Sequence, residues 1–510
     1  MNQETINTQL WEICESFKEK TDIKKNYIIY ISALLYLRYY KDNDFEELYN
    51  SRINYYIDED IDLKIKKIQN YDKYLFSNIH FKSVVTYRDL GEENILIKIV
   101  TDIKKLTDRV SKRIIAEAYE YVLKQSVIKN DILKQNGEFY TPIEITDLMC
   151  NLIIEEDNKS IYDPGYGSGN FIKSAMNKCN GKVFGEEKNL DYYNICKTRL
   201  LLNDINDENI IYEKENKLLQ NIRFDYILSN PPFSEKNWIE KIYDSKDYEI
   251  FNNYRLKPSS VGDYAYVIKM LSRLKNDGKM AVILPHGVLF RENEKEVRKR
   301  LIQENYIEAI IGLPENLFYT TRMAVIILII SKNKRNKNIF IIDASEDYSN
   351  DKKNKVLSQK YQDRIIDVYK NKTEIENYSR IITVKDVINN DFNLTIKKYI
   401  NKDDKKDNIE NKDIIQHLIK LEKEKNILEN NIKNVLEVLG YKEIVDLQQI
   451  TKEDNNYNVD YKVIGRNIKK ARTKNNLTQE DVAEKLCISS KYVSRIESGI
   501  GGLRLETLVN

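Results

Sequence analysis

The sequence contains few of the residues that build disulfide frameworks and metal centres. Five cysteines and three histidines are spread over 510 residues, and no two cysteines form a C-x-x-C pair. Structural zinc sites and disulfide frameworks both need such side chains at short, regular spacings. We therefore expect neither a bound metal nor a disulfide in this protein.

Long apolar runs are also missing. The longest, Met323–Ile330, has eight residues, whereas a membrane-spanning helix needs ~20. The first residues, "MNQETINTQLWEICESF", do not combine a basic start with an apolar core, so we expect no secretory signal peptide. Basic and acidic residues number 82 and 80, and 41% of the chain is hydrophobic. This composition is that of a soluble globular protein, which we expect in the cytoplasm and without membrane contact.

Proline is scarce, and its placement is informative. Two of the seven prolines are adjacent in "FDYILSNPPF", Phe224 to Phe233, directly after an apolar run that predicts a buried strand. Pro231 restricts Asn230 to an extended conformation, and Pro232 fixes the next step of the backbone. We therefore expect a rigid platform, on which the side-chain oxygen of Asn230 and the carbonyl oxygen of Pro231 accept hydrogen bonds from one amine.

Such a platform suits the activation of an amine that is conjugated to a planar ring. The lone pair of that amine is delocalised into the ring, which makes the amine a poor nucleophile. Two preorganised acceptors favour the pyramidal, electron-rich state that attacks a sulfonium methyl group, and Phe233 offers an aromatic face beside it. The alternative is an edge strand that ends in two prolines and has no chemical role.

A glycine-rich turn precedes this platform in the sequence. In "IYDPGYGSGNF", Gly165, Gly167 and Gly169 stand between a predicted strand and a predicted helix. They permit tight turns and a close approach of the backbone to a ligand at the carboxyl edge of a sheet. The next predicted strand ends in Glu186 and Glu187, where a carboxylate accepts hydrogen bonds from ribose hydroxyls. The pattern predicts a nucleotide-type cofactor site, and NAD, an adenosyl cofactor and a plain strand–helix turn stay open.

The order of predicted elements divides the chain into four parts. Residues 1–125 have a helical pattern without catalytic motifs. Residues 126–400 alternate seven short apolar runs with helical segments, which is typical of βαβ units and a parallel sheet. Residues 401–450 contain a seam of apolar residues at spacings of four and three, a candidate coiled coil. Residues 460–510 have a compact, all-helical pattern.

Together these motifs resemble the N6-adenine DNA methyltransferases, in particular the modification subunit of type I restriction–modification systems. The similarity extends to about residue 440 and follows the family's order, with "GEFYTPI" first, then "DPGYGSGNF", "VFGEE" and "SNPPF". It implies an α/β fold. We expect a Rossmann-like sheet of the S-adenosylmethionine-dependent methyltransferase type, with an all-α N-terminal domain, a helical or coiled-coil tail and a C-terminal helix-turn-helix.

The resemblance also implies a role for individual residues. A flipped adenine would present its amine to the N-P-P-F segment, and no metal would take part. Cytosine-C5 methylation is excluded separately, because it needs a nucleophilic cysteine, typically after a proline, and none of the five cysteines follows one. The implied catalytic residues are Asn230, Pro231, Pro232 and Phe233. The implied contacts to S-adenosylmethionine are Glu138, Phe139, Tyr140, Thr141, Pro142, Ile143, Asp163, Gly165, Gly167, Ser168, Gly169, Asn170, Glu187 and Asn216.

The last part of the chain resembles the phage-repressor-like helix-turn-helix. From Ile464 to Ser498 there are eight Lys/Arg residues against four Asp/Glu residues. The segment "SSKYVSRIES" is the expected recognition helix, and the chain stops partway through a fourth predicted helix, so we expect a truncated module. A helical dimerisation unit that never contacts DNA is the alternative. The residues expected to contact DNA are Gln479, Ser490, Lys491, Ser494 and Arg495.

The resemblance implies duplex DNA as the substrate and a specificity subunit and a restriction subunit as partners, while the helical tail allows a homodimer. Two other functions stay open. The first is a DNA-binding regulator with a degenerate methyltransferase fold, because Gly165 and Tyr166 replace the Ala-Cys or Ala-Ala pair usual in the family's turn. The second is a methyltransferase acting on protein glutamine or RNA, since N-P-P-[FY] also serves such amides and amines.

Overall fold

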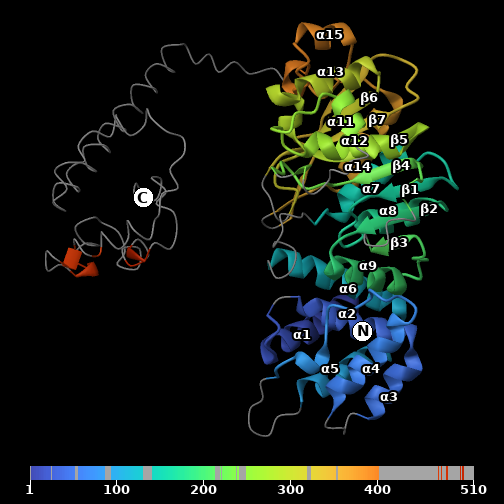
Figure 1. The fold of residues 1–510 in the computed structure, drawn as a ribbon, viewed down its shortest axis with the longest axis vertical. Helices are drawn as coiled ribbons and strands as arrows, with labels where there is room; N and C mark the ends of the chain where they lie inside the picture. Colours follow the sequence, from blue (N-terminus) through green and yellow to red (C-terminus); the bar gives the residue numbers. More distant parts are fainter. Residues whose placement is uncertain are drawn as a thin grey trace. The chain divides into compact units, whose positions relative to one another are not determined.

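The computed structural model describes residues 2–24, 26–51, 56–86, 94–129, 140–212, 219, 221–236, 238–239, 248–318, 323–351 and 354–400, together with residues 469, 472–473, 478–480, 494 and 497–498. Met1–Asp403 form one compact unit and Asp404–Asn510 form another (Figure 1). The predicted boundaries at residues 125, 400 and 450 stay predictions. The predicted helical seam of 401–450 lies outside the described residues.

The first part of the chain is helical, as its pattern predicts. Every residue from Tyr27 to Leu37 is buried, because this stretch of α2 is uncharged on all faces. The neighbouring α4 instead buries one stripe, Ile57, Ile61, Ile65 and Ile68. No helix in the described part of the chain is long and apolar enough to cross a membrane. The helices are α1 (Gln3–Lys20), α2 (Tyr27–Tyr40), α3 (Asp42–Asn50), α4 (Ile57–Gln69), α5 (Ile95–Thr107) and α6 (Lys112–Ile128).

The middle of the chain folds around one sheet. Among the described residues, nine of its strands lie in the order β11-β8-β6-β7-β5-β4-β1-β2-β3. The seven predicted apolar runs form β1 to β7, and each has buried side chains because the sheet is covered on both faces. The strands are β1 (Ser160–Asp163), β2 (Lys182–Glu187), β3 (Ile210–Tyr212), β4 (Phe224–Ser229), β5 (Leu274–Pro285), β6 (Ile307–Gly312), β7 (Val325–Ser331), β8 (Ile339–Asp343) and β11 (Ser379–Ile382), and a separate antiparallel pair is β9 (Ser349–Asp351) with β10 (Asn354–Val356).

The predicted parallel sheet is in fact mixed, because two of its strands run antiparallel to their neighbours. β7 runs antiparallel to both β5 and β6, and β11 runs antiparallel to β8. β6 and β7 are consecutive in the chain, and antiparallel neighbours can be joined without the crossover helix that parallel strands usually need. The remaining pairings, from β3 across to β5 and between β6 and β8, are parallel.

Two apolar layers cover the sheet, one on each face. Along β5, Ala281 and Ile283 belong to the first layer, and Met280 and Val282 belong to the second, because successive side chains of a strand point to opposite faces. The first layer contains residues of α7 (Ile143–Ile153), α8 (Asn170–Lys178), α9 (Leu190–Leu202) and α14 (Gln359–Asn371), and extends into the N-terminal helices. The second contains residues of α11 (Tyr248–Asn253), α12 (Asp263–Arg273), α13 (Lys295–Gln303) and α15 (Val384–Asn389).

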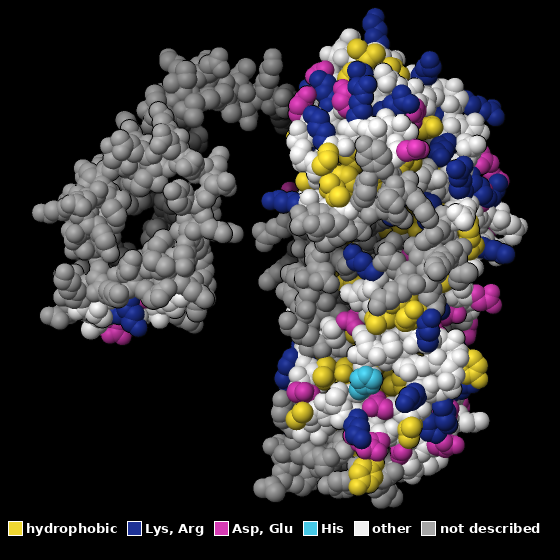
Figure 2. All heavy atoms as spheres, in the orientation of Figure 1, with side chains coloured by type: hydrophobic (Ala, Val, Ile, Leu, Met, Phe, Trp, Pro, Cys, Tyr) yellow, Lys and Arg dark blue, Asp and Glu magenta, His cyan; other side chains and the backbone are white. Residues whose placement is uncertain are grey.

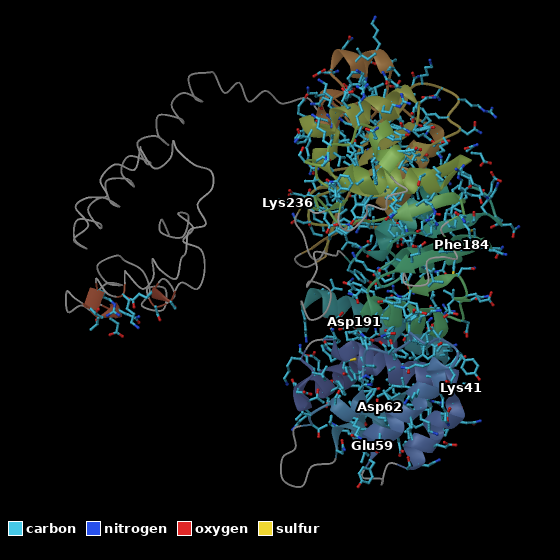
Figure 3. The ribbon with its side chains drawn as sticks, in the orientation of Figure 1. Lys41, Glu59, Asp62, Phe184, Asp191 and Lys236 are labelled. Atoms are coloured by element: carbon cyan, nitrogen blue, oxygen red, sulfur yellow. The ribbon has the colours of Figure 1, made fainter. Side chains whose placement is uncertain are left out.

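Polar contacts on α9 fix the N-terminal helices against the sheet. Asn194 is fully buried, where its Oδ1 accepts from the Phe76 backbone N–H at 2.8 Å and its Nδ2 donates to Asn78 Oδ1 at 2.9 Å. Asp191, at the start of the same helix, accepts from the side-chain amide of Asn26 at 2.7 Å (Figure 3). Figure 2 shows Lys and Arg side chains gathered at the end of this unit where α13 and α15 lie.

Candidate active site

The order of the strands places the two predicted motifs next to each other. The chain runs from β1 through β2 to β3 on one side, then crosses back to form β4 on the other side of β1. β1 and β4 are parallel neighbours, so the segments after Asp163 and Ser229 leave the sheet at the same edge. In open α/β sheets, ligands bind at the carboxyl edge beside a reversal of strand order of this kind. We call the edge between the ends of β1 and β4 the crevice.

The glycine-rich turn begins where β1 ends. Gly167 and Gly169 have left-handed backbones, with φ of 52° and 86°. A Cβ at Gly169 would lie 2.4 Å from Cys196 Sγ, so this position requires glycine for space as well as for conformation. A Cβ at Gly165 or Gly167 would meet nothing within 4 Å. The turn therefore faces open space at these two glycines, where a ligand can approach the backbone.

Tyr166 points away from this open side. Its side chain is 4% exposed, and its hydroxyl donates to the Ile211 carbonyl oxygen at 3.4 Å. Gly185 of β2 leaves room for the ring, since a Cβ there would lie 2.6 Å from Tyr166 Cδ1. The unusual Gly165–Tyr166 pair thus adds bulk to the core and not to the crevice.

Within the described part of the chain, two buried oxygens beside the turn have no hydrogen-bond partner. Asp163 is 3% exposed, its Oδ1 accepts from the Gly165 backbone N–H at 3.2 Å, and its Oδ2 accepts from no group. Burial raises the pKa of the Asp163 carboxyl to about 8, and the nearby Glu187 adds to the rise. The second such atom is Asn170 Oδ1, in the first residue of α8. Buried acceptors of this kind are costly unless a ligand supplies a donor.

Of the two acidic residues that end β2, Glu187 is the one that reaches the turn. Its Oε2 accepts from the Gly167 backbone N–H at 2.9 Å, and its Oε1 accepts from the Asn189 N–H at 2.8 Å. Glu186 lies elsewhere, where its Oε1 accepts from the Tyr162 hydroxyl at 2.9 Å. The position of Glu187 agrees with its predicted contact to a ribose, which stays a prediction.

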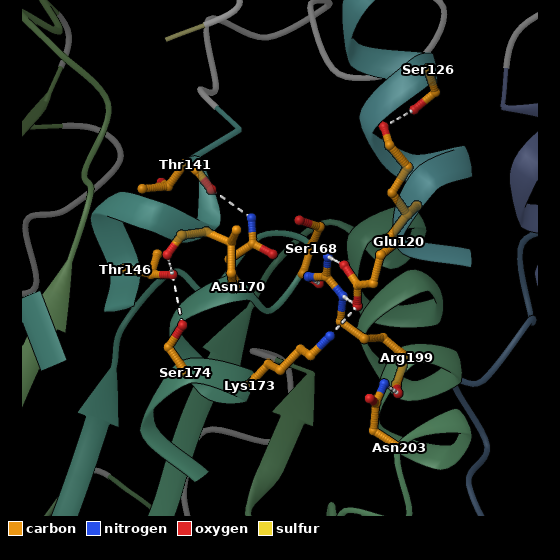
Figure 4. A network of polar contacts seen from close by, with 12 residues as sticks. Glu120, Ser126, Thr141, Thr146, Ser168, Asn170, Lys173, Ser174, Arg199 and Asn203 are labelled. Atoms are coloured by element: carbon orange, nitrogen blue, oxygen red, sulfur yellow. Dashed lines mark hydrogen bonds and ion pairs between the residues drawn. The ribbon is translucent and has the colours of Figure 1, made fainter. Parts of the chain in front are cut away.

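Thr141 links the turn to the N-P-P-F segment. Its backbone carbonyl accepts from Asn170 Nδ2 at 2.5 Å (Figure 4), and its Oγ1 accepts from Asn230 Nδ2 at 2.8 Å. The amide nitrogen of Asn230 is therefore engaged, and its Oδ1 is buried with no partner among the residues that the structure describes. This oxygen is the atom expected to accept from an amine. Pro142 and Ile143 continue into the start of α7, and Phe233 is partly buried against the first apolar layer.

Sequence reasoning missed a buried ion pair behind the turn. Arg199 of α9 is 0% exposed, and its guanidinium donates to the Ser168 carbonyl at 2.7 Å and to Glu120 Oε1 at 2.8 Å (Figure 4). Lys173 donates to the same Oε1 at 2.9 Å. Burial alone would favour neutral Glu120, but the charges of Arg199 and Lys173 lower its pKa. Arg199 is one of three charged residues in α9, and nothing near it in the sequence points to Glu120, 79 positions away.

The helix-turn-helix segment contains a second buried ion pair. Glu497 is 5% exposed and accepts from Arg472 Nε at 2.5 Å and Arg472 NH2 at 3.0 Å. Gln479 Nε2 also donates to Glu497, at 2.8 Å, so the amide nitrogen of this predicted DNA contact has a partner inside the unit. Ser494 is exposed, as a groove-facing residue requires. The other predicted residues Glu138, Phe139, Asn216, Ser490, Lys491 and Arg495 lie outside the described residues.

Comparisons with known proteins agree on one family. The sequence profile of the family described as N-6 DNA methylase matches residues 110–408. The chain belongs to the N-6 DNA methylase family. A second profile, described as helix-turn-helix, matches residues 468–510, which agrees with the expected C-terminal module.

The relatives of this N-6 DNA methylase include methylase subunits of type I restriction enzymes. The MpnII methylase subunit of Mycoplasma pneumoniae is 30% identical over 388 residues, which cover 71% of this chain and 70% of that protein. The MjaIX methylase subunit of Methanocaldococcus jannaschii is 22% identical over 519 residues, which cover 86% and 92%. The fold is that of the type I restriction-modification system methyltransferase subunit from Streptococcus thermophilus, with a TM-score of 0.66 and 23% identity, over 79% of this chain and 100% of that chain.

Proposed function

We propose that this N-6 DNA methylase transfers a methyl group from S-adenosylmethionine to N6 of adenine in duplex DNA, as the modification subunit of a type I restriction–modification system. The observation that carries the proposal is the state of Asn230. Its amide nitrogen donates to Thr141 Oγ1, and its buried Oδ1 accepts from no group that the structure describes.

The residues around the crevice fit S-adenosylmethionine, which supplies an electrophilic sulfonium methyl group when bound. Asp163 Oδ2 and Asn170 Oδ1 are buried acceptors that match the donors of an amino-acid moiety, and Glu187 matches a ribose. Gly165 and Gly167 leave open space at the turn. We infer that the cofactor is held by the three polar residues and two glycines just named, together with the Tyr140–Ile143 segment. Further predicted contacts are Glu138, Phe139, Ser168, Gly169 and Asn216.

In the proposed reaction, Asn230 Oδ1 and the Pro231 carbonyl accept the two hydrogens of the adenine amine. These contacts stabilise the positive charge that develops on N6 as its lone pair attacks. As the bond from N6 to the methyl carbon forms, the bond from that carbon to sulfur would break, and S-adenosylhomocysteine would leave as a neutral thioether. Neither acceptor titrates near neutral pH, so they polarise the amine without removing its proton, and the surplus proton on N6 passes to water after the transfer. Thr141 keeps the Asn230 amide from rotating, which preorganises the acceptor before the base arrives. Phe233 stacks against the flipped base.

The partners belong to the same proposal. Several relatives are named as methylase subunits of type I restriction enzymes, so we infer a specificity subunit and a restriction subunit as partners. The helix-turn-helix would add a DNA contact, and residues 401–450 would dock on a partner or a second copy. The fold of residues 110–408 favours this function over a regulator without activity, because Tyr166 leaves the crevice open.

Methylation-sensitive sequencing of host DNA, with and without the gene, tests the proposal. We expect N6-methyladenine at one recurrent motif in the parent strain and unmodified adenine at that motif in the deletion strain. Identical methylation maps in the two strains would contradict DNA as the substrate and favour methyl transfer to protein glutamine or RNA.

A further inference from the structure

The residue after the N-P-P-F segment has an unfavourable backbone conformation. Ser234 has φ of 53°, the left-handed region that residues with a Cβ rarely adopt. The sequence places no glycine there, although glycine would take this conformation without strain. A strained residue next to a reactive segment persists only where its surroundings hold it in place.

Two charged residues hold Ser234. Its backbone N–H donates to Asp263 Oδ1 at 2.8 Å, and its Oγ accepts from Arg291 NH2 at 3.0 Å. The other nitrogen of that guanidinium, NH1, donates to Asp263 Oδ2. The three residues therefore close a ring of hydrogen bonds directly after Phe233, with Ser234 contributing both its backbone N–H and its hydroxyl.

This ring is itself fixed from behind. Asp263, the first residue of α12, is 0% exposed. The Arg291 carbonyl accepts from Arg298 NH1 at 2.8 Å, and Arg291 NH1 also lies 3.3 Å from the buried Glu294. Gly287 leaves room for the guanidinium, since a Cβ there would lie 2.5 Å from Arg291 Nε. Arg291 thus has little freedom to move away from Ser234.

We propose that Asp263 and Arg291 are positioning residues of the reaction. They hold Ser234 in its left-handed conformation and so fix Phe233, one residue earlier, where it stacks on the target adenine. The two prolines constrain the segment on one side, and the Asp263–Arg291 pair constrains it on the other. The inference rests on the proposed adenine methylation. On this inference, Asp263 and Arg291 affect the placement of the base and leave cofactor binding unchanged, because none of their described contacts reaches the glycine-rich turn.

A double-mutant cycle on the full-length chain, assembled with its partner subunits, tests this role. The variants are Ser234→Ala, Arg291→Ala and their combination, with Arg291→Lys as the conservative change. The single-turnover rate of methyl transfer from labelled S-adenosylmethionine to DNA of a deletion strain is measured, beside cofactor affinity by calorimetry. Arg300→Ala is the matched control, since it removes a half-exposed arginine that pairs with Glu304 on α13.

We expect Ser234→Ala to slow transfer about tenfold and Arg291→Ala about a hundredfold, each with the cofactor dissociation constant within twofold of the parent. The combined variant should be no slower than Arg291→Ala, because both changes break the same contact, and Arg291→Lys should recover part of the rate.

Unchanged rates of methyl transfer, effects of the two substitutions that multiply, or a parallel loss of cofactor affinity would overturn the positioning role. If Arg291→Ala does not fold, Ser234→Ala and Arg291→Lys decide it. A parent protein that does not methylate DNA would refute the proposed function and this inference together. A parent that methylates DNA, with variants that show one of the contradicting results above, would refute the inference alone.

Discussion

Asn230 Nδ2 donates a hydrogen bond to Thr141 Oγ1 at 2.8 Å, across 89 positions of sequence. The bond decides which end of the Asn230 amide faces the crevice, because the engaged nitrogen leaves Oδ1 as the available acceptor. The backbone carbonyl of Thr141 also accepts from Asn170 Nδ2. Thr141 therefore contacts both the glycine-rich turn and the N-P-P-F segment.

Removal of this bond should slow the reaction without loss of the fold. Thr141→Val keeps the shape of the side chain but removes the acceptor, so Asn230 Nδ2 loses its partner at a cost of about 1–3 kcal/mol. We expect the rate of methyl transfer to fall roughly 5- to 150-fold, whereas Thr141→Ser, which keeps the hydroxyl, should stay within a few-fold of the parent. Single-turnover kinetics of the two variants measure the difference, and equal rates would contradict the orienting role of Thr141.

Cofactor affinity should depend on pH through Asp163. The pKa of its carboxyl in the folded protein is about 8, so the anion that binds a cationic amino group is scarce below that pH. We expect the affinity for S-adenosylmethionine to rise by up to about tenfold per pH unit as the pH approaches 8. Above that pH the affinity should fall again, because an α-amino group loses its own proton at about pH 8. Calorimetric titrations between pH 6 and 9 test this expectation. Asp163→Asn should bind weakly at every pH; a steep pH dependence in that variant would point to another group.

The same carboxyl should destabilise the free protein at alkaline pH. Its folded pKa lies above its ordinary value of 3.8, so between these two pH values the folded state holds a proton that the unfolded state has lost. Stability therefore falls as pH rises through this window. Thermal unfolding without cofactor should show Asp163→Asn above the parent in melting temperature at pH 8, and by a smaller margin at pH 5. A lower melting temperature at pH 8 would refute the assignment.

The ion pair behind the turn should contribute to stability as well as to cofactor binding. Arg199→Ala leaves the buried Glu120 carboxylate without its main partner, which costs about 3–5 kcal/mol in comparable buried pairs. It also frees the Ser168 carbonyl within the turn. Denaturant unfolding measures the first effect and cofactor titration the second. Arg113→Ala is the control, since that arginine on α6 is 88% exposed in its pair with Glu117 and its removal should change neither quantity.

Replacement by alanine should lower the stability of the protein at one glycine of the turn and leave it unchanged at another. Gly169→Ala places a Cβ 2.4 Å from Cys196 Sγ on a backbone with φ of 86°, and we expect a loss of about 1–3 kcal/mol in stability. Gly165→Ala enters open space and restores the alanine usual in the resembling family, so stability should hold and cofactor affinity should be kept. Thermal unfolding of the two variants shows whether glycine is required only where a Cβ would clash, as at Gly169, or at every glycine of the turn. Equal losses of stability in the two variants would contradict the first alternative.

The strands, and the placement of the glycine-rich turn and the N-P-P-F segment at one edge of the sheet, could be predicted from sequence, and several contacts could not. Apolar runs such as Phe224–Ser229 identify strands because burial on both faces demands them. The direction of β7 depends on its connection to β6, which periodicity does not encode. Neither the Arg199–Glu120 pair nor the left-handed Ser234 has a local signature, because each depends on groups 29 or more positions away in sequence.

The central claim is that Asn230 activates the adenine amine, and one comparison tests it most directly. The parent protein and Asn230→Ala, each with its partner subunits, are incubated with methyl-labelled S-adenosylmethionine and DNA of the deletion strain, and label in N6-methyladenine is counted. We predict that both bind the cofactor with similar affinity, and that the variant transfers methyl groups at least about 10²-fold more slowly, as expected for loss of a preorganised acceptor. Equal labelling of adenine by the two proteins would contradict the account.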